Sequence, residues 1–148
     1  MISITEWAAR WGVSSEALAD LRASVLDAPT PPPSTVTGPE SLVMAEVRLE
    51  ASRQGYRLWR NNVGAGKLEN GSFLRWGLCN ESAQMNHMMK SSDLIGISPD
   101  GQFVARECKA RGWVYTGTPR EVAQRAFIDF INARGGDAAF ATGEGTLG

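Results

Sequence analysis

Residues 91–109 read SSDLIGISPDGQFVARECK, in which two apolar runs flank the turn sequence Ser-Pro-Asp-Gly. Proline favours the second position of a type I turn, and glycine is common at its fourth position. The stretch therefore predicts an antiparallel hairpin with strands over Leu94–Ile97 and Phe103–Cys108.

Three charged side chains are expected at one end of this hairpin. Successive side chains of a strand point to opposite faces, so Glu107 and Lys109 share a face while Cys108 points away. Asp93 begins the partner strand, and the turn folds it back beside Glu107. Two carboxylates and an ammonium group should therefore meet at one end of a sheet.

This group of charges has a known chemical use. Two hard oxygen ligands suit Mg²⁺, which binds carboxylates, carbonyl oxygens and water in octahedral geometry. Such a cation neutralises charge that grows on a phosphoryl oxygen. A lysine two residues beyond the glutamate orients the attacking water or stabilises the charged transition state. The alternative is a salt bridge between cross-strand neighbours, because the spacing Asp-x13-Glu-x-Lys is common.

Composition indicates an ordinary globular protein. The chain has 148 residues, of which 43% are hydrophobic and 21% charged, enough for one domain with a core. It has neither a long apolar run nor a secretory signal, and its two cysteines lack metal or disulfide spacing. We therefore expect a cytoplasmic protein of a bacterial or phage-infected cell, with no membrane partner. Because the net charge is −1, DNA binding would depend on local basic clusters.

Three segments are predicted along the chain. Residues 1–28 resemble a helix-turn-helix, with helices over residues 4–11 and 15–26. The second helix carries Glu16 and Asp20, which favours docking over the reading of DNA bases. Residues 29–39 form a Pro-rich linker. Residues 40–148 form the main domain.

The main domain is predicted to be α/β with a mixed central sheet. Its first half is expected to contain a helix over 40–54, a strand over 56–59 and a flexible stretch over 63–66. A long polar region over 67–90 follows, with a short strand at 72–76. The hairpin comes next, and after it a helix from Thr118 to about Arg134 and a strand over 137–142. Thr118, Pro119 and Glu121 predict a capping box. Val122, Phe127, Ile128 and Ile131 should face the core, as should Trp59 and Trp76. The glycine-rich tail should fray.

Residues 38–142 resemble the VRR-NUC domain of the PD-(D/E)XK nuclease superfamily. The matching segments are ESLVMAEVRL, LWRNNVGA, SSDLIGI, FVARECK and the helix of Gln124 that ends before GGDAAF. The resemblance implies a restriction endonuclease-like αβββαβ core and divalent-metal-dependent cleavage of DNA.

The resemblance also implies roles for residues of the hairpin. Asp93, Glu107 and the backbone carbonyl of Cys108 correspond to the metal ligands, with Mg²⁺ as the cofactor and Mn²⁺ as its substitute. Lys109 corresponds to the catalytic lysine. Gln124 corresponds to a glutamine that contacts this lysine or the DNA backbone; the alternative is a solvated surface residue.

A glutamate of the first helix completes the implied catalytic set. Glu40 precedes Gly55 by the spacing typical of the family. Glu46 is the second choice, and Glu50 the last. Because Glu40 and Glu46 lie on different helix faces, only one of them is expected to serve the metal.

Several polar residues are predicted to contact DNA because they follow a strand or lie in the polar region. They are Arg60, Asn61, Asn62, Lys67, Arg75, Lys90 and Arg111. The Arg-Asn-Asn sequence also has an ordinary explanation as turn chemistry. His87 is interpreted as a loop residue rather than a general base, and Trp113 as a residue that could stack on a base.

These observations predict a Mg²⁺-dependent deoxyribonuclease, specifically an endonuclease acting on branched, flap or junction DNA. It would work as a homodimer or within a larger DNA-processing assembly, and a phage origin fits its size. The alternatives are a non-catalytic DNA-binding or assembly module of the same fold, and an unrelated α/β interaction domain.

Overall fold

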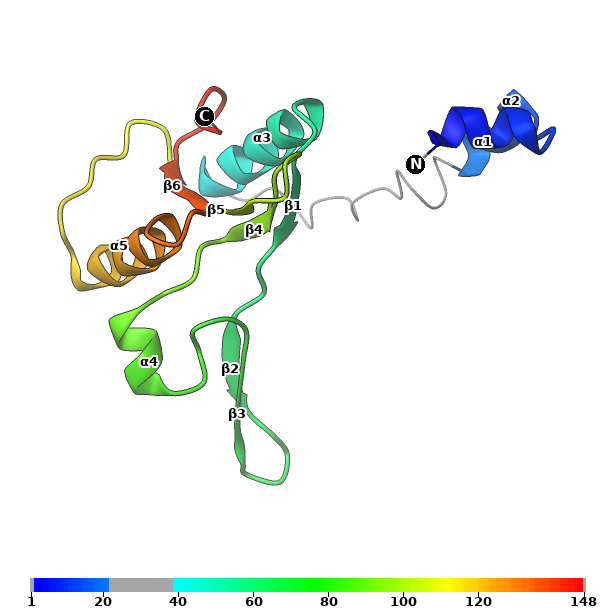
Figure 1. The fold of residues 1–148 in the computed structure, drawn as a ribbon. Coiled ribbons are helices and arrows are strands. Elements are labelled where there is room, and N and C mark those ends of the chain that lie inside the picture. Colours follow the sequence, from blue (N-terminus) through cyan, green and yellow to red (C-terminus); the bar gives the residue numbers. More distant parts are fainter. Residues whose placement is uncertain (1, 22–38, 148) are drawn as a thin grey trace. The chain divides into compact units, whose positions relative to one another are not determined.

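The computed structural model describes residues 2–21 and 39–147, and the chain separates into two compact units, Met1–Val36 and Thr37–Gly148. Figure 1 shows their elements. The predicted linker lies outside the described residues except for Pro39, which begins a helix. Residues 22–26 of the predicted second helix also lie outside them. No helix in the described ranges is long and apolar enough to cross a membrane.

The first unit contains the two predicted short helices. Helix α1 spans Ile4–Arg10 and begins with a capping box between Ser3 and Glu6. Helix α2 spans Ser15–Leu21. Ala8 and Leu18 are buried.

The second unit has a four-stranded mixed sheet among its described residues. Its strand order is β1 (Arg57–Arg60), β4 (Leu94–Ile97), β5 (Phe103–Cys108) and β6 (Asp137–Ala141). The first three strands pair antiparallel, whereas β5 and β6 pair parallel. A mixed α/β architecture is therefore confirmed.

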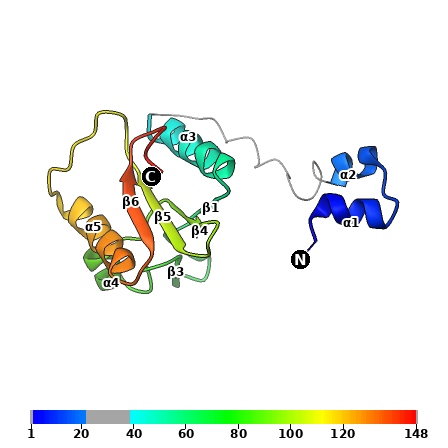
Figure 2. The same ribbon diagram turned by 45° about the horizontal axis from the view of Figure 1, so that its top comes forward.

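One helix lies on each face of this sheet (Figure 2). Helix α3 spans Pro39–Arg53 and packs Val43, Val47 and Ala51 against Val104 and Cys108. Helix α5 spans Pro119–Asn132 and packs Phe127 and Ile128 against Ala105. Because side chains alternate along a strand, even-numbered residues of β5 face α3 and odd-numbered residues face α5.

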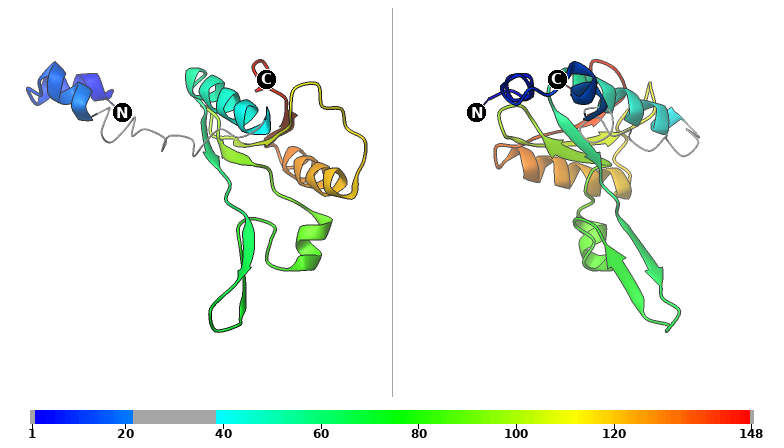
Figure 3. Two further views of the ribbon diagram at one scale, coloured as in Figure 1. Left: turned by 180° about the vertical axis from the view of Figure 1, so that it is seen from behind. Right: turned by 90° about the vertical axis from the view of Figure 1, so that its right-hand side faces the viewer.

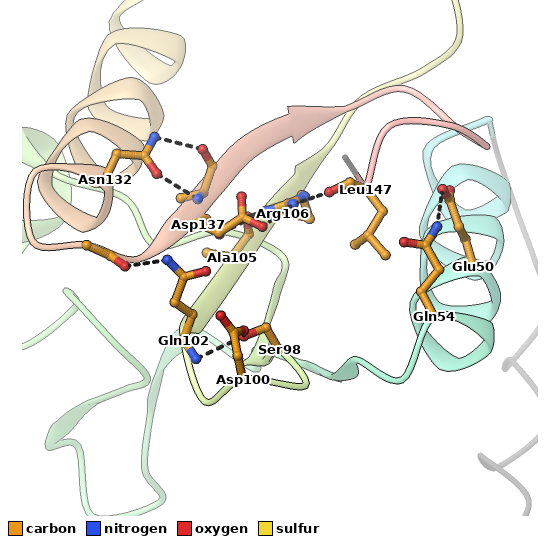
Figure 4. Close-up of polar contacts among 12 residues, drawn as sticks. Glu50, Gln54, Ser98, Asp100, Gln102, Ala105, Arg106, Asn132, Asp137 and Leu147 are labelled. Carbon is orange, nitrogen blue, oxygen red and sulfur yellow. Dashed lines mark hydrogen bonds and ion pairs between the residues drawn. The ribbon is translucent and has the colours of Figure 1, made fainter.

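The predicted central hairpin is confirmed to the residue. The turn at its end is closed by the N–H of Gly101, which donates to the carbonyl of Ser98 at 3.0 Å. Gly101 has φ of 90°, a left-handed conformation that glycine adopts without strain. Ser98 also bonds Asp100 and the N–H of Gln102 through its hydroxyl, as drawn in Figure 4.

The prediction of a frayed tail is wrong for the described residues. Leu147 is fully buried in the α3 layer, and its carbonyl accepts a hydrogen bond from the guanidinium of Arg106 (Figure 4). Arg106 also donates to the carboxylate of Asp137 at 2.9 Å. A buried cation in β5 thus fixes the C-terminal segment against the sheet.

The capping box of α5 is confirmed. The Thr118 hydroxyl accepts from the N–H of Glu121, and the Glu121 carboxylate accepts from the N–H of Thr118 at 3.0 Å. This backbone hydrogen bond, with others from Thr116 and Trp113, lowers the pKa of Glu121 to about 2. The cap fixes where α5 begins and therefore which side chains face the sheet.

The stretch over 63–66 and the polar region over 67–90 contain more regular structure than predicted, although the predicted strand at 72–76 is confirmed as β3. This region forms strands β2 (Gly64–Lys67) and β3 (Phe73–Trp76), which pair as a separate two-stranded hairpin, and helix α4 (Ala83–Met88). The hairpin projects away from the four-stranded sheet (Figures 1 and 3). Strand β2 is difficult to recognise in the sequence because it contains two glycines. Gly64 is required there, since the Trp76 ring occupies the space that a side chain at this position would fill.

Some predicted core residues are exposed. The exposed fractions of Trp59 and Trp76 are 54% and 42%, and that of Val122 is 52%. Phe127 and Ile128 are buried as predicted. Trp59 and Trp76 lie in short strands that have one face or both faces open, so an aromatic strand residue is not necessarily a core residue.

Candidate active site

The structure brings the three charged residues of the central hairpin together at one end of the sheet. The Asp93 carboxylate accepts a hydrogen bond of 2.9 Å from the N–H of Cys108. The Glu107 carboxylate lies 3.3 Å from the ammonium of Lys109. Asp93 and Glu107 line the same cavity, so the predicted juxtaposition is present.

Gln124 of α5 connects the glutamate and the lysine. Lys109 Nζ donates to Gln124 Oε1 at 2.9 Å, and Gln124 Nε2 donates to Glu107 Oε1. Only 2% of Gln124 is exposed. The alternative of a solvated surface glutamine is therefore wrong, and each end of the amide holds one charged group in place.

The pKa values of both carboxylates, Glu107 and Asp93, are raised above their usual values. Burial, and after it the neighbouring charge of Asp93, together raise the pKa of Glu107 to about 7, against the opposing effects of Lys109 and Arg120. Burial also raises the pKa of Asp93, and the charge of Glu40 adds to this effect. A bound cation would offset both effects, because it favours the ionised carboxylates.

This donor set fits a cation that keeps water or substrate ligands. Among the described residues, no group of three or more acidic, histidine or cysteine side chains is placed to hold a metal ion. Mg²⁺ is usually bound by one or two carboxylates together with waters and substrate phosphates. Asp93 and Glu107 satisfy that requirement, with the backbone carbonyl of Cys108 as a further possible ligand.

The first helix places Glu40 and Glu46 in different surroundings. Both carboxylate oxygens of Glu46 lie 2.7 Å from Arg111. Glu50 accepts hydrogen bonds from Gln54 and from the N–H of Gly145. Glu40 instead acts electrostatically on Asp93. Of these three glutamates, Glu40 is the one whose charge acts on Asp93, although its side chain is exposed and does not line the cavity that Asp93 lines.

A cavity of about 400 Å³ opens beside the carboxylates. Four cationic side chains line it, namely Arg60, Arg75, Lys90 and Arg120. None of them has an acidic partner within 4.0 Å among the residues that the structure describes. The pKa of Lys90 is lowered by burial and by the nearby charges of Arg120 and Arg75. Such a cluster of unpaired cations is suited to phosphate.

Most of the predicted DNA contacts line this cavity, but two do not. Arg60, Asn61, Asn62, Arg75 and Lys90 line it. Lys67 is exposed on β2 outside it. Arg111 pairs with Glu46, which leaves its guanidinium engaged with α3.

Asn61 is occupied by the protein itself. Its side-chain amide donates to the hydroxyl of Ser91 at 2.8 Å and to the carbonyl of Ser92 at 2.9 Å. Its N–H donates to the carbonyl of Asp93 at 2.8 Å. Asn61 therefore fixes the chain that carries Asp93.

Sequence reasoning missed Arg120 and two asparagines. Arg120 lies four residues before Gln124 on α5, so both side chains lie on one helix face. That spacing was the available signal. Asn80 and Asn86 hold Arg75 and Lys90 respectively, and neither has a recognisable motif.

Trp113 is engaged within the protein. Its ring centroid lies 4.7 Å from that of Phe140, and its indole N–H donates to Glu121 at 3.0 Å. The Lys109 ammonium lies 5.7 Å from the Trp113 ring centroid. The ring therefore covers the lysine rather than standing free to stack on a base. His87 lies on α4 and does not line the cavity.

Comparison of the chain with protein-family models, curated proteins and solved structures finds no match.

Proposed function

We propose that this chain is a divalent-metal-dependent deoxyribonuclease with a restriction endonuclease-like core of the VRR-NUC type. The observation that carries the proposal is the buried Glu107–Gln124–Lys109 network beside Asp93. A salt bridge between Glu107 and Lys109 that only stabilised the fold would not need the carboxylate of Asp93 beside it. The cavity lined by unpaired cations adds a binding site for the phosphates of the substrate.

The chain's own residues divide the work of hydrolysis. Arg60, Arg75, Lys90 and Arg120 bind the backbone phosphates at the cavity. Gln124 holds the Lys109 ammonium toward the carboxylates, where it donates a hydrogen bond to the attacking water or to a phosphoryl oxygen. Asp93, Glu107 and the Cys108 carbonyl would hold Mg²⁺ or Mn²⁺, which when bound would supply positive charge against the charge that grows on the phosphoryl oxygens.

Glu40 and Glu46 have separate roles in this proposal. Glu40, whose charge acts on Asp93, orients water at the site. Glu46 ties α3 to Arg111 and takes no part in cleavage. Cleavage should therefore fall in Glu40→Gln and stay near wild type in Glu46→Gln, and equal activity of the two variants would remove the helix glutamate from the mechanism.

The proposed substrates are branched, flap or junction DNA. The test is cleavage of labelled junction, flap, linear duplex and single-stranded DNA with Mg²⁺ or Mn²⁺, comparing wild type with Glu107→Gln and Lys109→Met. We expect metal-dependent cleavage by wild type alone. Binding of DNA without cleavage by wild type would support the non-catalytic DNA-binding module, and neither binding nor cleavage would support an unrelated interaction domain.

A further inference from the structure

The β2–β3 hairpin has two chemically different faces. In its register Lys67 pairs with Phe73, and Ala65 pairs with Arg75. Directly paired residues of an antiparallel ladder project to the same side, and side chains two apart along a strand share a face. Lys67, Phe73 and Arg75 therefore form one surface, here called the cationic face. Arg75 lies 5.3 Å from the Phe73 ring centroid, which confirms that they are neighbours.

The opposite face is closed by its own aromatic residue. Gly64 pairs with Trp76, and Gly66 pairs with Leu74. An added Cβ at Gly64 would lie 2.4 Å from the Trp76 ring, so the indole covers the backbone of β2. The two faces thus differ, although both carry exposed apolar side chains.

The cationic face leads into the cavity. Arg75 and Ala65, at the base of the hairpin, line the cavity, whereas Lys67 and Phe73 lie farther out. Figure 3 shows the hairpin extending away from the four-stranded sheet, whose strand β5 contains Glu107. A linear ligand that leaves the cavity on this side would continue along Phe73 and Lys67.

A buried asparagine fixes the base of the hairpin. Asn80 Nδ2 donates to the carbonyl of Gly64 at 2.6 Å and to that of Trp76 at 2.9 Å. Its Oδ1 accepts from Arg75 at 3.1 Å. Because only 3% of Asn80 is exposed, the direction of both strands and of the arginine is set by the protein before any ligand binds.

The cationic face matches one class of ligand. Phe73 is 58% exposed, and among the described residues neither Lys67 nor Arg75 has an acidic partner within 4.0 Å. An exposed aromatic ring between cations is the combination that binds single-stranded nucleic acid, through base stacking and phosphate contact. A duplex keeps its bases stacked inside and offers no free base face to Phe73.

We propose that the cationic face guides an unpaired strand of DNA into the cavity, with Phe73 stacked on a base and Lys67 and Arg75 on backbone phosphates. This inference rests on the proposed function, because the face leads to a DNA site only if the cavity takes DNA. It specifies the substrate: DNA with a single-stranded segment beside the position of cleavage.

The test compares two substitutions on opposite faces of one hairpin. Phe73→Ala and Leu74→Ala each remove an exposed apolar side chain, and thermal unfolding checks that both variants are folded. Binding is measured in EDTA by fluorescence anisotropy, with labelled single-stranded, blunt duplex and tailed duplex DNA. Phe73→Ala should weaken binding of single-stranded and tailed DNA by about tenfold, whereas Leu74→Ala should bind within about twofold of wild type.

The charge contribution has its own measurement. Lys67→Ala should reduce the slope of log Kd against log salt for single-stranded DNA by about 0.7, because one phosphate contact is lost. Equal affinities of Phe73→Ala and Leu74→Ala would overturn the proposal. The proposal would also be overturned if Phe73→Ala weakened binding of blunt duplex DNA as much as binding of single-stranded DNA. That result would indicate that the β2–β3 hairpin lies in a groove of the duplex.

Failure of this inference and failure of the proposed nuclease function can be told apart. Cleavage by wild type without a difference between the two hairpin variants would remove the guiding role and leave the nuclease. The expected difference in binding without any metal-dependent cleavage would remove the nuclease and leave the guiding role. Absence of DNA binding by wild type would overturn both.

Discussion

Arg106 and Glu107 are adjacent in β5, and both are almost completely buried, yet their surroundings are opposite in character. Arg106 faces the α3 layer, where Asp137 and the carbonyls of Ala105, Asp137 and Leu147 accept its hydrogen bonds. Glu107 faces the α5 layer, where Lys109 and Gln124 hold it but Asp93 repels it.

The difference separates a charge whose partners all come from the protein from one that the proposed cation would balance. The Arg106 guanidinium has one carboxylate and three carbonyl contacts, and only its Nε is without a partner among the described residues. The site around Glu107 has two carboxylates and Glu40 nearby, with one lysine in direct contact. Burial alone therefore does not mark a charge as a candidate functional group, whereas an unbalanced local charge does.

Loss of the ionic groups at the Glu107 site should produce the largest effect, and on activity. Glu107→Gln and Lys109→Met should each reduce the cleavage rate by about 10³-fold, because each removes a group that acts on the charge of the transition state. Single-turnover cleavage of a labelled junction measures this loss. Far-ultraviolet circular dichroism should show both variants folded, and cleavage by either variant within tenfold of wild type would contradict the assignment.

Loss of Arg106 should instead act on stability. Arg106→Ala leaves a void and takes the donor away from three backbone carbonyls and from the half-buried carboxylate of Asp137. We therefore expect the free energy of unfolding to fall by about 3 kcal/mol. Urea titration measures the change. Arg125→Ala is the matched control, since its ion pair with Asp129 is exposed and should contribute less than about 0.5 kcal/mol.

The pH dependence of stability should distinguish the two buried charges further. Folding raises the pKa of Glu107 from 4.5 to about 7, so the folded state binds this proton more tightly than the unfolded state. The resulting stability is present below pH 4.5 and is lost as pH rises through about 7. Between pH 5 and 8, wild type should lose roughly 2 kcal/mol more than Glu107→Gln, as measured by urea titrations at each pH.

The same comparison with Arg106→Leu is the control for that pH effect. Between pH 5 and 8 the free energy of unfolding of Arg106→Leu should fall by as much as that of wild type, because Glu107 is retained. If Glu107→Gln and wild type lost stability in parallel, the raised pKa of Glu107 would be excluded.

Divalent metal should stabilise the protein in a way that depends on the carboxylates. At a concentration ten times its Kd, Mg²⁺ should add about 1.4 kcal/mol to the free energy of unfolding. The increase in Tm should be larger at pH 8 than at pH 5, since Glu107 must be ionised to bind a cation. Asp93→Asn should abolish the increase, and an equal increase in that variant would place the metal elsewhere.

A small effect is expected at the exposed pair of Arg111 and Glu46. Arg111→Ala should change the free energy of unfolding by less than about 1 kcal/mol. Its cleavage rate and its affinity for DNA should remain within about twofold of wild type. A tenfold loss of DNA affinity in a filter-binding assay would restore Arg111 as a DNA contact.

The parts of the fold that sequence predicted well depend on local signals. The β4–β5 hairpin follows from a turn sequence and alternating side chains, and the start of α5 follows from Thr118, Pro119 and Glu121. These signals act over a few residues. The placement of Asp93 beside Glu107 depends only on that hairpin, so the centre of the site could also be predicted.

The parts that sequence missed depend on contacts distant along the chain. Strand β2 is rich in glycine, and its pairing with β3 depends on Trp76 covering Gly64. The buried position of Leu147 depends on Arg106, 41 residues earlier. Arg120 shares a helix face with Gln124, but only the contact of Gln124 with Glu107, 17 residues away, shows that this face belongs to the site. In each case the deciding partner lies outside the window that a local pattern covers.

The short turn at Ser98–Gly101 also bears on the order in which the site assembles during folding. Closing a short loop costs less chain entropy than closing a long one, and contacts between residues close in sequence form fastest. The β4–β5 hairpin should therefore precede the parallel pairing of β6, which must await the crossover through α5. Asp93 and Glu107 would meet early, when water still surrounds them, and Gln124 would arrive with the helix that excludes that water. The free-energy cost of burying Asp93 and Glu107 side by side is thus incurred in the last stage of folding, when the contacts of the sheet can offset it.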